Sequence, residues 1–508
     1  MGSFRLIITL LTLLAAFVAY LFQGIASPYL YGAPAEQARC RCFPGDECWP
    51  SKAQWNDFNL TLQGKLIATN PIASVCHNSQ FGAYDAEACN HLRSIWDLPE
   101  THHVTSSSPM APFYANMSCD PYTPPDAQCV VGSYVQYAVN ATSAGDYQLA
   151  LKFAREQNIR FVIRNTGHDY LSKSTGAGAL ALWTHHIRHI SVHDYSATYY
   201  DGKALKVGAG VMNSEAQAAA HEQGLVVVGG TCPSVGLAGG YAQGGGHGIL
   251  ASAYGLGADQ VLEWEVVTSD GEQLTATPTS NSDLYWALSG GGGGTYAAVL
   301  SMTLRAYPEK RGAWASLTFS SGDTDAFYRI VQTFLLSLPR MIDAGVGNLW
   351  VLGDGFFQMA PSTAPGMTSD ELRAFLQPTL DGLDRLEIPY GMSYNTYHYI
   401  NRHELIISTT DFVLADYPSY HAGFEAMNPQ YNITQFNIGG RFAPRSLIAS
   451  EAAIAPFMET LKFMINHGSV VSGMSLNVSR PPVAPNAAHP GWRSAALVLV
   501  YGMYVAPP

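Results

Sequence analysis

The sequence predicts an α+β protein with two structured domains, the second built on an antiparallel sheet covered by helices. Three observations predict this class. The chain has 508 residues, more than the roughly 100–200 of a single domain. Short apolar segments alternate with helical patterns up to about residue 308, and longer helical patterns alternate with strand-like segments beyond it. Finally, 47% of the residues are hydrophobic and only 13% are charged, which excludes a disordered or coiled-coil chain.

The charge balance bears on the kind of partner. With 39 acidic and 27 basic residues, the formal net charge is −12. An acidic chain has little general affinity for nucleic acid phosphates. We therefore expect a small-molecule partner and no nucleic acid.

Residues 1–26 have the pattern of a secretory signal peptide. Arg5 precedes an uncharged apolar run over residues 6–22, and Gly24 and Ala26 supply small residues at positions −3 and −1 of a cleavage after Ala26. The run is long for a signal and short for a membrane span, so an uncleaved anchor is the alternative. We expect a secreted or lumenal protein that meets a membrane only if this segment stays attached.

Five N-x-S/T sequons agree with the secretory pathway and predict glycosylation. Their asparagines are Asn59, Asn116, Asn140, Asn432 and Asn477.

Residues 27–123 form a Cys-rich segment with a helix expected over residues 56–66. Seven of the eight cysteines precede residue 130, as expected for disulfides in an oxidising compartment. A zinc site at Cys40, Cys42 and Cys48 is the alternative, but no matched second pair or nearby histidine completes it. Disulfides are therefore favoured.

The next two stretches are the structured domains. Over residues 124–308 we expect helices at 147–157 and 214–224 and strands at 160–163 and 204–207. Over residues 309–508 we expect strands at 313–319, 348–352 and 405–413 and helices at 325–336 and 369–383. The second set predicts a sheet covered by helices.

Glycine is concentrated in the first domain. Eleven glycines fall between residues 229 and 257, interleaved with large apolar residues that belong to packed structure rather than to a linker. Backbone without side chains can approach a large flat ligand, and turns of small residues offer N–H groups to phosphate. Residues 244–248 lack the dinucleotide fingerprint, and residues 290–294 are not followed by Lys and Ser/Thr. A Rossmann domain and a P-loop are therefore disfavoured.

Three segments carry a resemblance to a known family. They read RNTGHDYLSKSTGAGALALWTHH (164–186), GTCPSVGLAGGYAQGGGHGILASAYGLGADQVLEWEVVTSDG (230–271) and DLYWALSGGGGGTYAAVLSMTLRAYP (283–308). They resemble the flavin domain of FAD-linked oxidases of the berberine bridge enzyme type, in the vanillyl-alcohol oxidase superfamily. The resemblance extends over nearly the whole chain and to fungal members of secondary metabolism. It implies a two-subdomain PCMH-type FAD-binding domain over residues 124–308 and a substrate-binding domain over 309–508.

The resemblance also implies covalently bound FAD. His168 matches the histidine that bonds to the flavin 8α-methyl carbon, and Cys232 matches the cysteine that bonds to flavin C6 in doubly linked members. For Cys232, the sequence pattern points to the same role without the resemblance, because an unpaired cysteine in a glycine-rich segment that could bind a ligand is a candidate reactive thiol. The alternative is a buried, inert cysteine. The other expected cofactor-binding residues are Arg164, Asn165, Thr166, Gly167, Asp169, Thr175, Gly176, Gly236, Gly240, Gly244, Gly245, Gly246, His247 and Gly257.

The histidine-rich tract over residues 185–193 could in principle hold a metal ion, but the sequence does not favour it. His185, His186, His189 and His193 would gather on one face only if the tract were helical. The apolar residues between them fit a strand equally well, and the family carries a similar tract without metal. We expect no metal.

The catalytic base is expected from the second domain. Tyr397 and Tyr399 would share one face of a strand, although strands are generally rich in tyrosine. Glu404 and Asp411 are weaker candidates. The chain ends at Pro508 without the closing segment that family members usually carry, so we expect several tens of residues of the FAD site to be missing.

Together these observations predict an FAD-dependent oxidase. It would transfer hydride from a small secondary metabolite to covalent flavin and then to molecular oxygen, as in the ring closure that forms chanoclavine in ergot alkaloid biosynthesis. The alternatives are a secreted carbohydrate oxidase and a degenerate, non-catalytic flavoprotein.

Overall fold

The computed structural model describes residues 40–390, 412–427, 432–433 and 436–504. The chain divides into a unit of residues 1–42 and a compact unit of residues 43–508, and every helix and strand described here lies in the second. The predicted signal or anchor segment lies outside the described residues. Within them, no helix is both long enough and apolar enough to cross a bilayer.

The Cys-rich segment contains short helices tied by disulfides. Its elements are α2 (Lys52–Thr61), β1 (Leu66–Ala68), η2 (Ile72–Cys76), α3 (Ala86–Ile95), α4 (Pro99–His103) and η3 (Pro112–Ala115). Cys76 bonds to Cys89 and Cys119 to Cys129. Cys42 and Cys48 are also disulfide-bonded, which contradicts the zinc alternative.

The helix predicted over residues 56–66 was placed too late. Ser51 and Gln54 form a capping box that starts α2 at Lys52. The chain then leaves the helix, and Leu66–Ala68 pairs as a strand with β2 (Tyr137–Asn140). The sheet partner, which lies far along the sequence, therefore decides the conformation of Leu66.

A four-stranded sheet in the order β1-β2-β4-β3 begins the first structured domain. Its strands β2 (Tyr137–Asn140), β3 (Arg160–Arg164) and β4 (Ala179–Trp183) are parallel, and α5 (Ala144–Glu156) connects β2 to β3. The capping box of Ser143 and Asp146 begins α5, and buried Tyr147, Ala150 and Ala154 pack it on the sheet. Arg160 opens the predicted strand at the expected residue.

A five-stranded antiparallel sheet in the order β5-β6-β10-β8-β9 follows, with a two-stranded pair of β7 and β11 beside it. The strands are β5 (Ile190–Ala197), β6 (Tyr200–Gly208), β7 (Leu225–Val226), β8 (Val261–Val267), β9 (Gln273–Ala276), β10 (Ala298–Arg305) and β11 (Tyr307–Pro308). The helices are α6 (Asn213–His221), η4 (Leu237–Tyr241), α7 (Ala251–Tyr254), η5 (Ala258–Gln260) and α8 (Ser282–Leu288).

The second structured domain is a seven-stranded antiparallel sheet in the order β15-β12-β14-β13-β17-β18-β16. Its strands are β12 (Gly312–Ser320), β13 (Gly347–Gly353), β14 (Phe356–Pro365), β15 (Phe412–Tyr417), β16 (Phe436–Pro444), β17 (Val470–Ser475) and β18 (Ala495–Tyr504). The helices are α9 (Thr324–Asp343), α10 (Ser369–Arg385), α11 (Tyr420–Met427), η6 (Arg445–Ile448), α12 (Glu451–Asn466) and η7 (Pro490–Arg493). The strand expected over residues 405–413 falls mostly outside the described residues.

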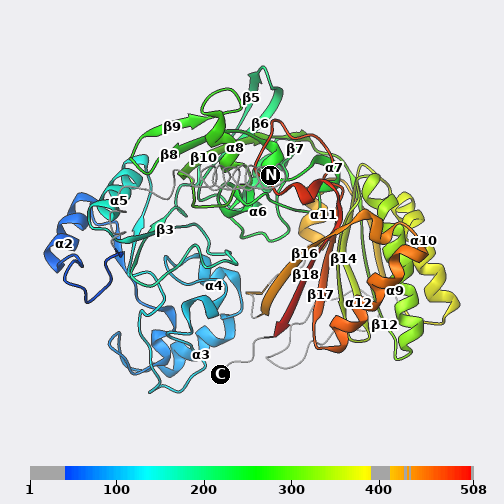
Figure 1. The fold of residues 1–508 in the computed structure, drawn as a ribbon, viewed down its shortest axis with the longest axis horizontal. Coiled ribbons are helices and arrows are strands. Elements are labelled where there is room, and N and C mark those ends of the chain that lie inside the picture. The colour runs from blue at the N-terminus through cyan, green and yellow to red at the C-terminus, as the bar shows by residue number, and fades with distance from the viewer. Residues whose placement is uncertain (1–39, 391–411, 428–431, 434–435, 505–508) are drawn as a thin grey trace, which may run out of the picture. The chain divides into compact units, whose positions relative to one another are not determined.

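Helices α9, α10 and α12 cover one face of this sheet, as Figure 1 shows. Helix α9 buries residues at helical spacing, including Phe327, Ile330, Phe334 and Leu338, against the sheet. This confirms the expected antiparallel sheet covered by helices. The last strand, β18, lies inside the sheet between β17 and β16.

Candidate functional site

His168 lies in the turn that follows β3. Gly167 has φ of +86°, and a Cβ there would lie 2.4 Å from Nη1 of Arg164. Only glycine fits such a left-handed position against a neighbouring side chain. The turn therefore holds His168 in one orientation, at the end of a parallel strand.

Cys232 lies in a second loop, between β7 and η4, and the start of α6 fixes this loop. The backbone N–H of Asn213 donates to Val235 O at 2.9 Å, and that of Ser214 donates to Pro233 O at 3.0 Å. The Asn213 side chain donates to Gly230 O at 2.7 Å. These bonds hold the loop from both ends.

The two loops bring His168 and Cys232 together. Cys232 Sγ lies 3.8 Å from His168 Nε2. Ser234 Oγ lies between them, 2.8 Å from His168 Nε2 and 3.8 Å from Cys232 Sγ. Two residues that are 64 positions apart in the sequence thus form one small nucleophilic cluster.

Burial controls the protonation of this cluster. It lowers the pKa of His168 to about 3, with smaller contributions from His103, Arg164 and His102. It also raises the pKa of the Cys232 thiol, while hydrogen bonds from Ser234 oppose the rise. Near neutral pH the imidazole is uncharged and carries a lone pair on one nitrogen. Both side chains are only partly buried, so a ligand can reach them.

When His168 Nε2–H donates to Ser234 Oγ, the lone pair is on Nδ1, which is then the nucleophilic nitrogen. The hydroxyl of Ser234 therefore influences which nitrogen can react.

Arg164, the last residue of β3, packs against the turn that carries His168. Its guanidinium is 1% exposed and donates from Nη2 to the carbonyls of His102, at 3.2 Å, and Ser108, at 2.5 Å. Burial lowers the pKa of Arg164 to about 10. The guanidinium thus ties the segment after α4 to the turn.

His102 belongs to this support. It is fully buried, with Nε2 bonded to Trp96 O and Nδ1 to Ser108 Oγ, and burial lowers its pKa to about 4. It stays neutral beside the Arg164 cation.

Close packing within the protein accounts for several of the expected cofactor-binding glycines. Cβ atoms on Gly246 and Gly257 would lie 2.8 and 2.5 Å from the ring of Tyr241. One on Gly236 would lie 2.2 Å from Asn165 Nδ2. These glycines let a buried side chain lie against the loop. Their contact with the cofactor stays a prediction.

Other glycines leave room for a ligand. A Cβ on Gly240 would meet no described atom within 4 Å, and the same holds for Gly239. One on Gly245 would meet only Trp492 Nε1, at 4.0 Å, whereas one on Gly244 would lie 2.7 Å from Gly240 O. The open side of the loop is therefore at residues 239 and 240.

The third glycine-rich motif, residues 290–294, lies close to Gly240. A Cβ on Gly293 would lie 3.3 Å from Gly240 Cα, and the N–H of Gly292 donates to Gln243 O at 2.7 Å. Lys173, after the His168 turn, donates to Thr295 Oγ1 at 3.1 Å. All three motifs thus meet around Gly240, with one cation beside them.

The remaining expected residues of the 165–176 stretch form its framework. Asn165 donates to Ala209 O and contacts His185 Nδ1 through Oδ1. Asp169 accepts backbone N–H groups of Leu171, Lys173 and Ser174. Thr166 and Thr175 are buried, and a Cβ on Gly176 would lie against the Arg160 side chain.

His247 borders the cradle. Its side chain is exposed, but desolvation by the surrounding protein lowers its pKa to about 4, so the imidazole is neutral near pH 7. Its ring lies 5.8 Å from that of Trp492. Gly248 next to it packs on Gly229 and Gly230, which lead to Cys232.

The histidine tract does not gather on one face. His185 bonds to Asn165, His186 bonds to Asn140, and His193 lies on β5. Within the described ranges, no three His, Cys, Asp or Glu side chains are arranged to hold a metal ion.

Tyr397 and Tyr399, together with Glu404 and Asp411, lie outside the described residues, so the catalytic base stays a prediction.

These residues fit an FAD. A neutral imidazole and a thiol lie side by side at one end of a cradle that is open at Gly239 and Gly240, and Lys173 supplies a cation. Buried Gln243 Oε1 and Arg164 Nε have no partner among the described residues. When bound, a flavin would accept hydride from a substrate C–H bond.

The sequence did not single out Ser234, Tyr241 or Trp492. Ser234 could have been found, because it lies two residues after Cys232 in the same turn. Tyr241 could also have been proposed, since glycines surround it in the sequence. No pattern connects Trp492 to His247, because the contact joins different domains.

A model of an FAD binding domain matches residues 135–277, which include both His168 and Cys232. The FAD-linked oxidoreductase sor8 of Hypocrea jecorina (strain QM6a) is 43% identical over 484 residues, covering 95% of this chain and 80% of that protein. The bifunctional decalin synthase calF of Penicillium decumbens is 38% identical and covers 93% of this chain and 80% of its own length.

A solved structure shares the fold. The VAO-type flavoprotein MtVAO615 from Myceliophthora thermophila C1 superposes with a TM-score of 0.84 and 41% identity, over 92% of this chain and 83% of that one. The similarity covers both structured domains described above.

Proposed function

The chain belongs to the VAO-type FAD-linked oxidoreductases, and from that premise we propose that it is an oxidase with doubly attached FAD. His168 would bond to the flavin 8α carbon and Cys232 to flavin C6. The enzyme would remove hydride from a small secondary metabolite and pass the electrons to molecular oxygen, which leaves as hydrogen peroxide.

The observation that carries this proposal is the distance of 3.8 Å between Cys232 Sγ and His168 Nε2. The two residues match the two attachment points of the family: C6 is a carbon of the flavin's benzene ring, and the 8α carbon is a methyl group on that same ring. Neither side chain has a competing disulfide or metal partner in the described part of the chain. A flavin held at both points would be fixed in the cradle.

The name of one relative, the decalin synthase calF, supports a small organic metabolite as the substrate. The decalin synthase is named for a fused two-ring product, so ring formation is one reaction to test here. The ergot-type ring closure belongs to the same class. Acceptance of electrons by oxygen is supported by similarity to a flavoprotein oxidase, VAO615.

The first experiment asks whether flavin is present and attached. The protein is purified from a eukaryotic secretory host, denatured in acid and run on a gel under ultraviolet light. We expect yellow protein whose fluorescence stays with the polypeptide. Flavin that washes away would contradict covalent attachment, and a colourless protein would support the degenerate alternative.

The second experiment addresses the substrate. Hydrogen peroxide release is measured with a panel of ring-forming metabolites, alkaloids and sugars. Peroxide from an apolar metabolite supports the proposal, whereas peroxide from sugars alone would support the carbohydrate oxidase alternative.

We also propose secretion. The disulfides Cys76–Cys89 and Cys119–Cys129 support an oxidising compartment. Among the sequons, Asn116 is exposed, whereas Asn59, Asn140, Asn432 and Asn477 are partly buried. Asn116 is therefore the first glycosylation site to test, by a mass shift after treatment with an endoglycosidase.

A further inference from the structure

Residues 476–494, which connect β17 to β18, leave the seven-stranded sheet and lie along the glycine-rich loop of the first domain. We call them the crossover segment. Asn477 N donates to Ser252 Oγ at 3.1 Å, and Ala487 N donates to Ser289 O at 2.9 Å. A Cβ on Gly290 would lie only 2.4 Å from Ala488 N. The second domain thus adds a strip of backbone to the FAD-binding region.

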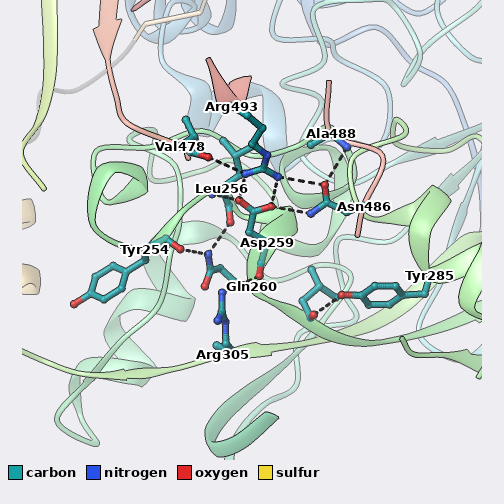
Figure 2. Close-up of polar contacts among 11 residues, drawn as sticks. Tyr254, Leu256, Asp259, Gln260, Tyr285, Arg305, Val478, Asn486, Ala488 and Arg493 are labelled. Atoms are coloured by element: carbon teal, nitrogen blue, oxygen red, sulfur yellow. Dashed lines mark hydrogen bonds and ion pairs between the residues drawn. The ribbon is translucent and has the colours of Figure 1, made fainter. Parts of the chain in front are cut away.

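One ion pair holds this segment, and Figure 2 shows it. Arg493 donates from Nη1 to Asp259 Oδ2 at 2.7 Å and from Nη2 to Asp259 Oδ1 at 2.6 Å. Asp259 is 1% exposed and also accepts Leu256 N and Asn486 Nδ2. These hydrogen bonds raise the pKa of Arg493 above its usual range.

The pair closes the crossover segment on itself as well. Arg493 Nη1 also donates to Val478 O at 3.0 Å, and Asn486 Nδ2 donates to Asp259 Oδ1 at 2.7 Å. Both ends of the segment and its middle therefore meet at one buried carboxylate. A bidentate pair with a buried carboxylate fixes geometry more strictly than a surface ion pair does.

The residue next to Arg493 is Trp492, which lies beside His247 and Gly245. Its ring lies 5.8 Å from that of His247 and 4.9 Å, edge to face, from that of Phe442 on β16. Its Nε1 is the one described atom that would lie within 4 Å of a Cβ on Gly245, at 4.0 Å. Trp492 thus lies between the glycine-rich loop and the large sheet.

We propose that Trp492 is a wall of the flavin cavity and that Asp259 and Arg493 are positioning residues that hold it there. The wall limits the size of molecules that approach the flavin from the side of the second domain. This inference rests on the proposed flavin site. It assigns a specificity role to a tryptophan and a positioning role to an ion pair outside the His168 and Cys232 cluster.

The test uses the holoenzyme and needs no known substrate. The bound flavin is reduced with dithionite, and its reoxidation is timed with compact ferricyanide and with the bulkier dye dichlorophenolindophenol. The variants are Trp492→Ala, Trp492→Phe, Arg493→Gln, Arg493→Lys and the double variant of Trp492→Ala with Arg493→Gln. The control is Arg155→Gln, which breaks an exposed pair with Asp270 by the same substitution.

We expect the rate with the dye, relative to that with ferricyanide, to rise severalfold in Trp492→Ala and Arg493→Gln and to stay unchanged in Arg155→Gln. Trp492→Phe and Arg493→Lys should fall between wild type and the Ala and Gln variants. The double variant should match Trp492→Ala, because Arg493 acts through Trp492. If the ratio of dye rate to ferricyanide rate is unchanged in Trp492→Ala, Trp492 does not limit access to the flavin. If this ratio in Arg493→Gln equals that in Arg155→Gln, Arg493 does not position Trp492.

Hydrogen exchange gives a readout that does not need flavin. In Arg493→Gln, peptides from residues 476–494 and 244–257 should lose protection together, whereas Trp492→Ala should leave residues 476–494 protected. Unchanged exchange in Arg493→Gln would overturn the positioning role. A colourless wild type would overturn the proposed function and the wall, while this measurement would still decide whether the ion pair holds the crossover segment.

Discussion

At the scale of single residues, the hydroxyl of Ser234 is the contact that most directly prepares His168. It lies 2.8 Å from Nε2 and is buried, with 5% of its surface exposed. A bond that fixes the proton on Nε2 leaves Nδ1 free to act as nucleophile. Loss of the hydroxyl should lower the fraction of His168 in the reactive tautomer.

We therefore expect Ser234→Ala to lower the fraction of polypeptide that keeps flavin after acid denaturation, when Cys232 is replaced by Ala in the same chain. Ser234→Thr keeps a hydroxyl, so in the same Cys232→Ala background it should keep the fraction of flavin-bearing polypeptide near that of the chain with Ser234. The fraction is read from intact mass. Equal flavin content in the Ala and Thr variants would show that Ser234 does not act on His168.

Gly167 offers a second test at this scale. Gly167→Ala places a methyl group at a left-handed φ and against Arg164, so it should lower the free energy of unfolding by about 1–3 kcal/mol or more. Gly271 has nearly the same φ, +87°, with no described atom within 4 Å of its Cβ position. Gly271→Ala thus measures the backbone cost alone. Equal losses in chemical denaturation would mean that the contact with Arg164 is unimportant.

At the scale of elements, helices and strands with strong periodicity were predictable. The sequence placed helices at 325–336 and 369–383, and the structure has α9 and α10 there, both longer. The end of α9 was missed because Pro339 argues against a helix interior, yet packing on the sheet outweighs it. Helix α10 continues through Pro378, which lies within the predicted range, and ends only two residues beyond that range.

Helix α9 is the element on which the second domain depends most. Phe334 is fully buried between this helix and the sheet, so Phe334→Ala should lower the free energy of unfolding by about 3–5 kcal/mol. Phe463 on α12 is 62% exposed and supplies the matched control. A loss for Phe463→Ala as large as that for Phe334→Ala would contradict this assignment of the core.

The candidate site was predictable in part. The motifs around His168 and Cys232 predicted two reactive side chains, but their distance of 3.8 Å follows only from the fold. Gly246 and Gly257 accommodate the ring of Tyr241, so close packing within the protein also requires glycine at these positions. The crossover segment could not be predicted, because its register on the first domain depends on tertiary contacts alone.

At the scale of the whole molecule, several neutral histidines make stability depend on pH. The pKa values of His102 and His185 are lowered to about 4 and that of His168 to about 3, mainly by burial. An unfolded histidine titrates near 6.5. Below about pH 6.5 the unfolded state binds more protons than the folded state, so stability falls with pH.

We expect the free energy of unfolding to decrease from about pH 6.5 to pH 4, by up to about 1.4 kcal/mol per pH unit for fully buried His102. His102→Gln should make this decrease shallower, and His91→Gln, at an exposed position, should leave it unchanged. Unfolding in urea at several pH values measures the slope. A slope that is the same in all three proteins would contradict the role of His102.

The proposed double attachment would draw on both subdomains. His168 follows a strand of the parallel sheet, whereas Cys232 depends on a loop fixed by α6 beside the antiparallel sheet. A flavin bonded to both would join the two subdomains covalently.

Peptide mapping of the digested holoenzyme tests this claim most directly. We predict one flavin-containing species in which the peptide with His168 and the peptide with Cys232 are joined through a single FAD. His168→Ala and Cys232→Ala should each leave the other peptide carrying flavin, and the double variant should carry none. Flavin found on any other residue, or on neither peptide in the wild type, would contradict the account.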